Sequence, residues 1–128
     1  MTLRKQLLLW LPVAAWMATI FFLSAQPDLP HPSAGWLDRL ISTAAHVFMF
    51  ALLALLSARA LGPGRRSGLI ALALTLLYAL SDEFHQLYVP GRHADPWDLA
   101  ADALGALLGV AAWAWLKRTI WISPKSRS

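Results

Sequence analysis

Cysteine is absent from all 128 residues of this chain. That absence excludes a disulfide framework, thiolate catalysis and a cysteine metal site. Charged residues are scarce as well, at 14% against about 25% in a typical soluble domain. Acidic residues are the scarcer kind, with 7 Asp and Glu against 11 Lys and Arg. A large soluble core is therefore not indicated, and the few ionisable residues need an explanation.

Apolar residues are abundant, at 58%, and they are blocked into four long runs. The runs cover residues 7–24, 41–61, 69–87 and 99–116. As helices they would be about 27–31 Å long, enough to cross a hydrocarbon core of about 30 Å. The sequence therefore predicts an all-α integral membrane protein, a compact bundle of four transmembrane helices. We expect one domain over residues 1–128, with a basic cytoplasmic tail at 117–128.

The charges are divided between the two ends of these runs. All seven acids lie on or toward one side, together with Arg39 and Arg92, and the other nine basic residues lie on the opposite side. The positive-inside rule then predicts that both termini are cytoplasmic, in the inner or plasma membrane of a bacterium. A cleaved signal peptide is the alternative for the first run. A nucleic-acid partner is not indicated, because the basic residues form no patch interleaved with aromatic residues.

Three ionisable residues fall at one membrane depth. Counted along helices from their basic ends, His46, Asp82 and Asp102 each lie about 20 Å above the inner boundary. Ionisable groups at such depth are costly, and by default they mark a functional site. We therefore expect a small polar cavity that opens outward between the second, third and fourth helices.

Helical spacing indicates which faces meet at this level. Thr75, Tyr78, Asp82 and Gln86 form a polar stripe on the third helix. Asp98, Asp102, Gly105 and Gly109 share one face of the fourth helix. Because glycines let a neighbouring helix approach closely, this face is predicted to lie in a helix interface.

The candidate catalytic residues are the carboxylates Asp82, Glu83 and Asp102, since acids in a poorly solvated volume can serve as general acid or base. Arg92 follows a Pro-Gly turn, and its fork suits a phosphate, pyrophosphate or carboxylate. The alternative for Arg92 is an ion pair with Asp95 or Asp98. The remaining candidate binding residues are His46, Gln86, Asp98, Ser24 and Gln26. The alternative for the whole set is a polar network that ties the helices together.

No cofactor or metal is predicted. The histidines match no standard zinc spacing, and the chain has no phosphate-binding loop or dinucleotide fingerprint.

The residues of this region resemble the VanZ-like family of small membrane proteins, named for a protein linked to teicoplanin resistance. The resemblance rests on SDEFHQ at residues 81–86, Pro90-Gly91-Arg92, then Asp98, Asp102, Gly105 and Gly109, with FFLSAQ at residues 21–26 and His46 in support. It extends from the first helix to the fourth. It implies a role in the cell envelope, with Asp82, Glu83, Gln86, Arg92, Asp98 and Asp102 as functional residues. Relatives often have Asn in place of Asp102.

Three classes of function fit these features. The first is a non-enzymatic envelope protein that binds a lipid, a lipid-linked precursor or a lipophilic glycopeptide at the outer leaflet. The second is a membrane-embedded hydrolase or transferase for an anionic lipid-linked substrate, with Glu83 or Asp82 as the base and Arg92 as the anion clamp. The third is a small proton-linked transporter, although four helices without repeat symmetry count against it unless the protein oligomerises. The oligomeric state is left open.

Overall fold

The computed structural model describes residues 1–27 and 35–121 of the chain. Its four helices are α1 (Leu3–Ser24), α2 (Trp36–Leu61), α3 (Arg65–Gln86) and α4 (Pro96–Trp121). All four are long and apolar enough to cross a membrane, and the described residues include no strand. The predicted helical bundle is thereby confirmed. The tail positions Lys125 and Arg127 and the proline-rich segment around Pro30 lie outside the described residues.

Three of the helices begin well before the apolar run predicted for them. α2, for example, begins at Trp36, ahead of the run at residues 41–61, because helical structure continues into polar flanks that hydrophobicity alone does not register. α4 likewise continues to Trp121, so that Lys117 and Arg118 belong to a helix. These extensions add helical turns at the ends of the bundle, where the charged residues lie.

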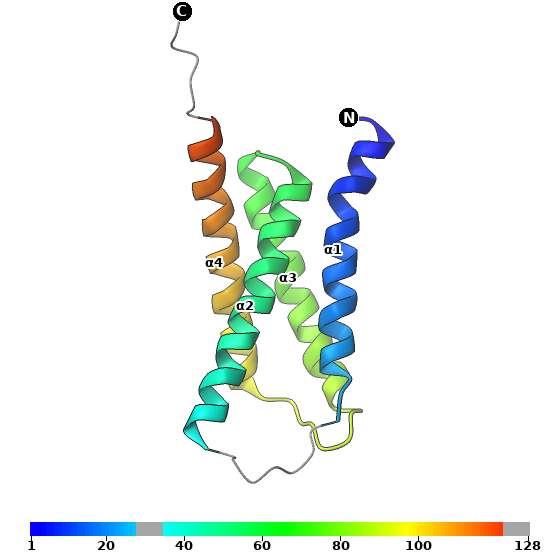
Figure 1. The fold of residues 1–128 in the computed structure, drawn as a ribbon, viewed down its shortest axis with the longest axis vertical. Helices are drawn as coiled ribbons and strands as arrows, with labels where there is room; N and C mark the ends of the chain where they lie inside the picture. Colours follow the sequence, from blue (N-terminus) through cyan, green and yellow to red (C-terminus); the bar gives the residue numbers. More distant parts are fainter. Residues whose placement is uncertain (28–34, 122–128) are drawn as a thin grey trace, which may run out of the picture.

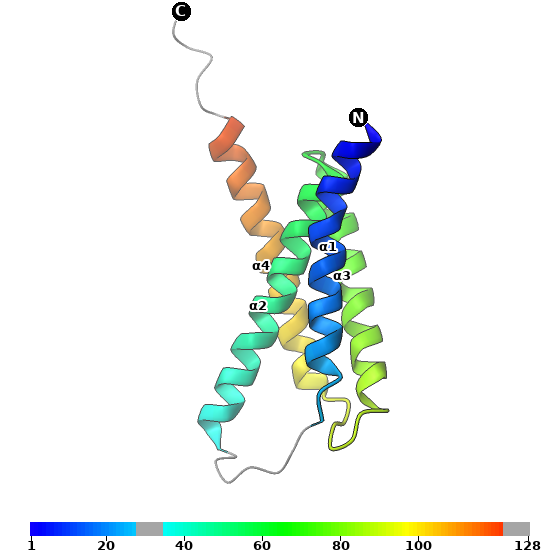
Figure 2. The same cartoon turned by 45° about the vertical axis from the view of Figure 1, so that its right-hand side comes forward.

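The helices run along one long axis (Figure 1). The end of α1, the start of α2 and the α3–α4 connection lie at one end, which also carries every acidic residue that the structure describes; we call it the acidic end. The beginning of α1, the α2–α3 turn and the end of α4 lie at the opposite, basic end. Seen from a second direction, α1 lies beside α2 and α3 while α4 leans away from it (Figure 2).

The closest packing in the bundle is between α2 and α4. A Cβ added to Gly105 would overlap the carbonyl oxygen of Val47, and one added to Gly109 would overlap that of Ala51. Only glycine permits this approach of the α4 face to the α2 backbone. The predicted role of the two glycines is confirmed, and the same face holds Asp102 with no exposed surface.

Large apolar side chains cover much of the outer surface of the bundle, as lipid contact would require. Leu8, Leu11, Phe22, Phe48 and Leu77 are each at least half exposed. The interior contains a cluster of buried apolar residues that includes Ile20, Phe50 and Leu53. Because lipid tails are as apolar as leucine, tight packing rather than water exclusion holds such helices together.

Candidate functional site

His46 on α2 connects to two carboxylates of α4. Its Nδ1 lies 2.7 Å from Oδ1 of Asp102, and its Nε2 lies 3.8 Å from Oδ2 of Asp98. Asp98 and Asp102 are one helical turn apart and share a face of α4, as their spacing predicted. His46 is 7% exposed and Asp102 is fully buried. His46 and Asp102, which were predicted to lie at one membrane depth, are thus in direct contact across the α2–α4 interface.

Asp82 on α3 has its partner on α1. The hydroxyl group of Ser24 donates a hydrogen bond to Oδ1 of Asp82, and both side chains are buried. Ser24 is the last residue of α1, so this bond joins α1 to α3, as do the hydrogen bond from the Tyr78 hydroxyl to the carbonyl oxygen of Met17 and the stacking of Phe21 on His85. The polar stripe of α3 continues along the same face with Thr75 and Gln86, which are buried as well.

Glu83 is directed toward the loop that leads into α4. Its Oε2 accepts a hydrogen bond of 3.0 Å from the backbone N–H of Asp95. Oδ1 of Asp95 in turn accepts a hydrogen bond from the backbone N–H of Trp97. Asp95 therefore caps α4, whose first residue is Pro96. Glu83 therefore fixes the start of α4, and with it the position of Asp98.

Two buried carboxylate oxygens of this region, and the amide of Gln86, have no hydrogen-bond partner in the described part of the chain. Oε1 of Glu83 and Oδ2 of Asp102 accept no hydrogen bond from any residue that the structure describes. The side-chain amide of Gln86, only 3% exposed, makes none within the same residues. A network whose sole role is to tie helices together would satisfy its members, since each buried unpaired polar group is destabilising. These groups therefore favour a functional site over a purely structural network.

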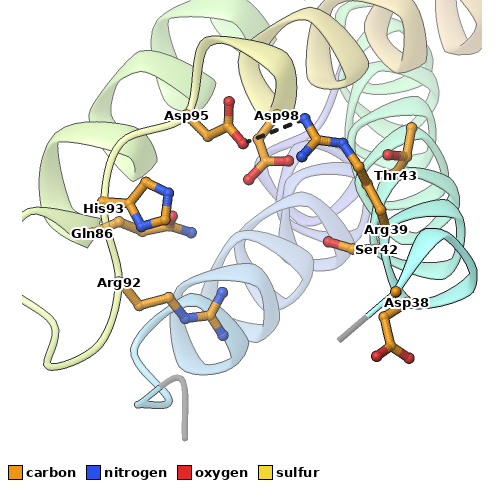
Figure 3. Close-up of a pocket in the computed structure, with 10 residues that line it drawn as sticks. Asp38, Arg39, Ser42, Thr43, Gln86, Arg92, His93, Asp95 and Asp98 are labelled. Carbon is orange, nitrogen blue, oxygen red and sulfur yellow. Dashed lines mark ion pairs between the residues drawn. The ribbon is translucent and has the colours of Figure 1, made fainter. Parts of the chain in front are cut away.

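Two cavities open among these residues. The larger, of about 510 Å³, lies between the start of α2 and the α3–α4 connection (Figure 3). Its lining is polar and includes Arg39, Gln86, Arg92, Asp95 and Asp98.

The smaller cavity, of about 360 Å³, lies between α1, α2 and α3. Ile20, Leu23 and Met49 give it a largely apolar lining, to which Ser24, Gln26, His46 and Asp82 add polar groups. Three residues, Ser42, Gln86 and Arg92, line both cavities, which therefore adjoin one another.

Arg92 reaches this junction through a tight turn. The carbonyl oxygen of Val89 accepts a hydrogen bond of 3.1 Å from the backbone N–H of Arg92, and Gly91 between them has a φ of 74°. A positive φ at the third position of such a turn is readily adopted only by glycine or asparagine. Nε of Arg92 donates to the carbonyl oxygen of Gln26 at 3.1 Å, which ties the loop to the end of α1.

The alternative prediction for Arg92 was an ion pair with Asp95 or Asp98. Asp95 instead lies 3.9 Å from Arg39, and Asp98 lies beside His46. Among the described residues, no ion pair involves Arg92. Its guanidinium group lines the cavities, and within residues 1–27 and 35–121 it has no carboxylate partner.

The structure brings most of the predicted site residues together, although not all at the cavity walls. Asp82, His46, Gln86, Arg92, Asp98, Ser24 and Gln26 line one or both cavities. Glu83 and Asp102 lie behind them and line neither cavity. As candidate catalytic residues these two would therefore act through a neighbour.

Several lining residues were not predicted from the sequence. Arg39, Ser42 and Thr43 come from the first turns of α2, and Trp97 stacks beneath Arg39 while donating from its indole N–H to the hydroxyl oxygen of Thr43. Arg39 could have been found as one of two basic residues on the acidic side of the chain. No group of residues within the described part of the chain is arranged to hold a metal ion.

This fold and this site define a class: a small, all-helical membrane protein with four spans and a buried polar cluster at one end of the bundle. The model of the VanZ/LLP1 family matches residues 9–117, nearly the whole chain, and the chain belongs to that family. It is accordingly a multi-pass membrane protein. No curated protein and no solved structure matches it.

Proposed function

We propose that this protein lies in the cell membrane with both termini in the cytoplasm, and that its acidic end binds the head group of an amphipathic envelope molecule. A lipid, a lipid-linked precursor and a lipophilic glycopeptide are the members of this class. The observation that carries the proposal is the pair of adjoining cavities, one polar and one largely apolar, which share Ser42, Gln86 and Arg92.

The two linings correspond to the two parts of an amphiphile. A polar head group would occupy the larger cavity, and the first apolar segment of the ligand would occupy the smaller one. Ligand sites commonly have volumes of about 300–1,000 Å³ and combine apolar walls with a few placed polar groups. Both cavities fall in that range, at about 510 and 360 Å³.

Arg92 is the proposed anchor for the head group. A guanidinium fork binds a phosphate or carboxylate through two parallel hydrogen bonds, and Arg92 has no carboxylate partner among the described residues. Nε is held by Gln26, so that the outer nitrogens remain for a ligand.

The test is to titrate the purified protein, in a mild detergent, with phospholipids of matched acyl chains and to count bound lipids by native mass spectrometry. We expect Arg92→Gln to weaken binding about tenfold or more, as for loss of a charged hydrogen bond. The affinity of the Arg92→Lys variant should lie between those of the unsubstituted protein and the Arg92→Gln variant, because lysine keeps the positive charge but lacks the planar guanidinium group.

The matched control is Arg66→Gln, which removes an exposed arginine at the basic end. It should leave the affinity within about twofold of the original. Equal binding by the Arg92→Gln and Arg66→Gln variants would contradict the proposal.

A second candidate is a hydrolase or transferase for an anionic lipid-linked substrate, and the contact of His46 with Asp102 favours it. A histidine oriented by a buried carboxylate is a common general base, and His46 and Asp82 both line the smaller cavity. The assay is phosphate release from a polyprenyl pyrophosphate, which His46→Gln and Asp82→Asn should abolish. Release no faster than in protein-free vesicles would eliminate this candidate.

A further inference from the structure

The larger cavity contains opposite charges that are not paired with each other. Arg39 and Asp95 form an ion pair with a distance of 3.9 Å. Arg92 and Asp98 also line the cavity, yet no ion pair joins them within the described residues. They approach the cavity from different sides, Arg92 from the loop after α3 and Asp98 from the first turn of α4 (Figure 3).

Within the described residues, Asp98 forms no ion pair with an arginine or a lysine. Its nearest basic group is Nε2 of His46, at 3.8 Å, which is beyond hydrogen-bond distance. The same imidazole is hydrogen-bonded at 2.7 Å to Asp102. The imidazole of His46 is within hydrogen-bond distance of Asp102 but not of Asp98, so the carboxylate of Asp98 is available to a ligand in the cavity.

From this arrangement we infer that the bound head group is zwitterionic, with an anionic phosphate on Arg92 and a primary ammonium on Asp98. The inference rests on the proposed function and specifies its ligand. A ligand with both charges would satisfy both walls, whereas a purely anionic head group would leave Asp98 facing like charge.

Gln86 provides a second, independent indication of a ligand at this place. Its side chain is only 3% exposed, lines both cavities and makes no hydrogen bond among the described residues. An amide offers two N–H donors and an acceptor oxygen. At the junction of the cavities, beside Arg92, it can donate to a phosphate oxygen. Because this amide lines the cavities and has no hydrogen-bond partner within the described residues, its N–H groups are available to a ligand oxygen.

The experiment compares two lipids that differ in the ammonium group alone. Phosphatidylethanolamine and its N-acetyl derivative, with identical acyl chains, are titrated separately into the full-length protein in a mild detergent and followed by native mass spectrometry. We expect phosphatidylethanolamine to bind about tenfold or more tightly, the effect of one buried charged hydrogen bond.

Substitution of Asp98 locates the discrimination. Asp98→Asn should reduce the difference between the two lipids to about twofold or less, and Asp98→Glu should keep most of it, because the charge is retained. The comparison of the two lipids in the unsubstituted protein tests the zwitterionic head group even where a variant does not fold.

The outcomes separate this inference from the proposed function. If both lipids bind equally and this binding is lost in Arg92→Gln, the inference of a zwitterionic head group is contradicted, while the proposed head-group site at Arg92 is retained. Binding that Arg92→Gln does not alter for either lipid would overturn both. Discrimination that persists unchanged in Asp98→Asn would contradict the role given to Asp98.

Discussion

Buried carboxylates with incomplete partners are the most informative residues of this protein. Asp102 has no exposed surface, and one of its oxygens contacts His46 while the other has no partner among the described residues. Related sequences are expected to tolerate asparagine at this position, and the geometry explains why. An asparagine oxygen can still accept a hydrogen bond from Nδ1 of His46.

Asp102→Asn should therefore change the free energy of unfolding by less than about 1 kcal/mol, whereas Asp102→Ala should lower it by about 1–3 kcal/mol. The alanine variant leaves His46 buried without its partner, and that is the physical reason for the difference. Unfolding by SDS in mixed micelles measures both values. Equal losses in the two variants would show that the hydrogen bond to His46 does not matter for stability.

At the scale of helices, the α2–α4 interface determines where the site lies. Gly105 and Gly109 allow α4 to touch the backbone of α2, which places Asp98 and Asp102 beside His46. The connection after α3 is the second determinant, because Asp95 caps α4 while Glu83 holds Asp95. The positions of the acids therefore depend on two backbone contacts rather than on the acids alone.

Gly109→Leu should destabilise the protein by at least about 1–3 kcal/mol, since its Cβ would overlap the backbone of Ala51 and the helices would have to separate. The matched control is Gly64→Ala, whose Cβ would meet only the Ser67 hydroxyl oxygen, at 3.6 Å, an ordinary contact. SDS titration of both variants provides the measurement. A Gly109→Leu variant as stable as Gly64→Ala would show that α2 and α4 are not in close contact.

At the scale of the whole molecule, the division of charge predicts which end faces the cytoplasm. The described residues of the basic end include Arg4, Lys5, Arg65 and Arg66, and the acids lie at the other end. By the positive-inside rule we propose that the basic end is cytoplasmic.

Because the chain has no cysteine, single cysteines can report this orientation directly. Gly35→Cys and Ala94→Cys should react with a membrane-impermeant maleimide added to intact cells, and Gly64→Cys should react after lysis only. Labelling of the Gly64 variant alone in intact cells would reverse the orientation.

Much of this architecture could be predicted, because the position of a residue in its helix gives its membrane depth and the helical spacing of residues gives the face that they share. Counting residues placed His46 level with Asp102, and spacing placed the two glycines on the face that meets α2. The bond from Ser24 to Asp82 could not be predicted in this way, because α1 has no polar stripe that reveals its rotation. The membrane depth of Asp82 therefore does not indicate which residue it contacts on another helix.

The partner of Asp95 was equally hidden. The apolar run of the second span begins at residue 41 and leaves Arg39 outside it, whereas α2 begins at Trp36 and Arg39 on its first turns lies 3.9 Å from Asp95. In the described part of the chain Arg92 pairs with no carboxylate; the turn at Gly91 brings it instead to the carbonyl oxygen of Gln26. The pairing of these side chains depends on local backbone conformation, which cannot be predicted from the pattern of hydrophobic residues.

The central claim, that an amphiphile binds at the acidic end, is tested most directly by crosslinking a phosphatidylethanolamine that carries a photoreactive diazirine at the start of its acyl chain. After irradiation of the reconstituted protein, crosslinked peptides are mapped by mass spectrometry. The account predicts crosslinks at the linings of the two cavities, on residues 20–26, 42–49 and 82–92, and their loss in Arg92→Gln. Crosslinks spread evenly over the lipid-facing leucines, and unchanged in Arg92→Gln, would contradict it.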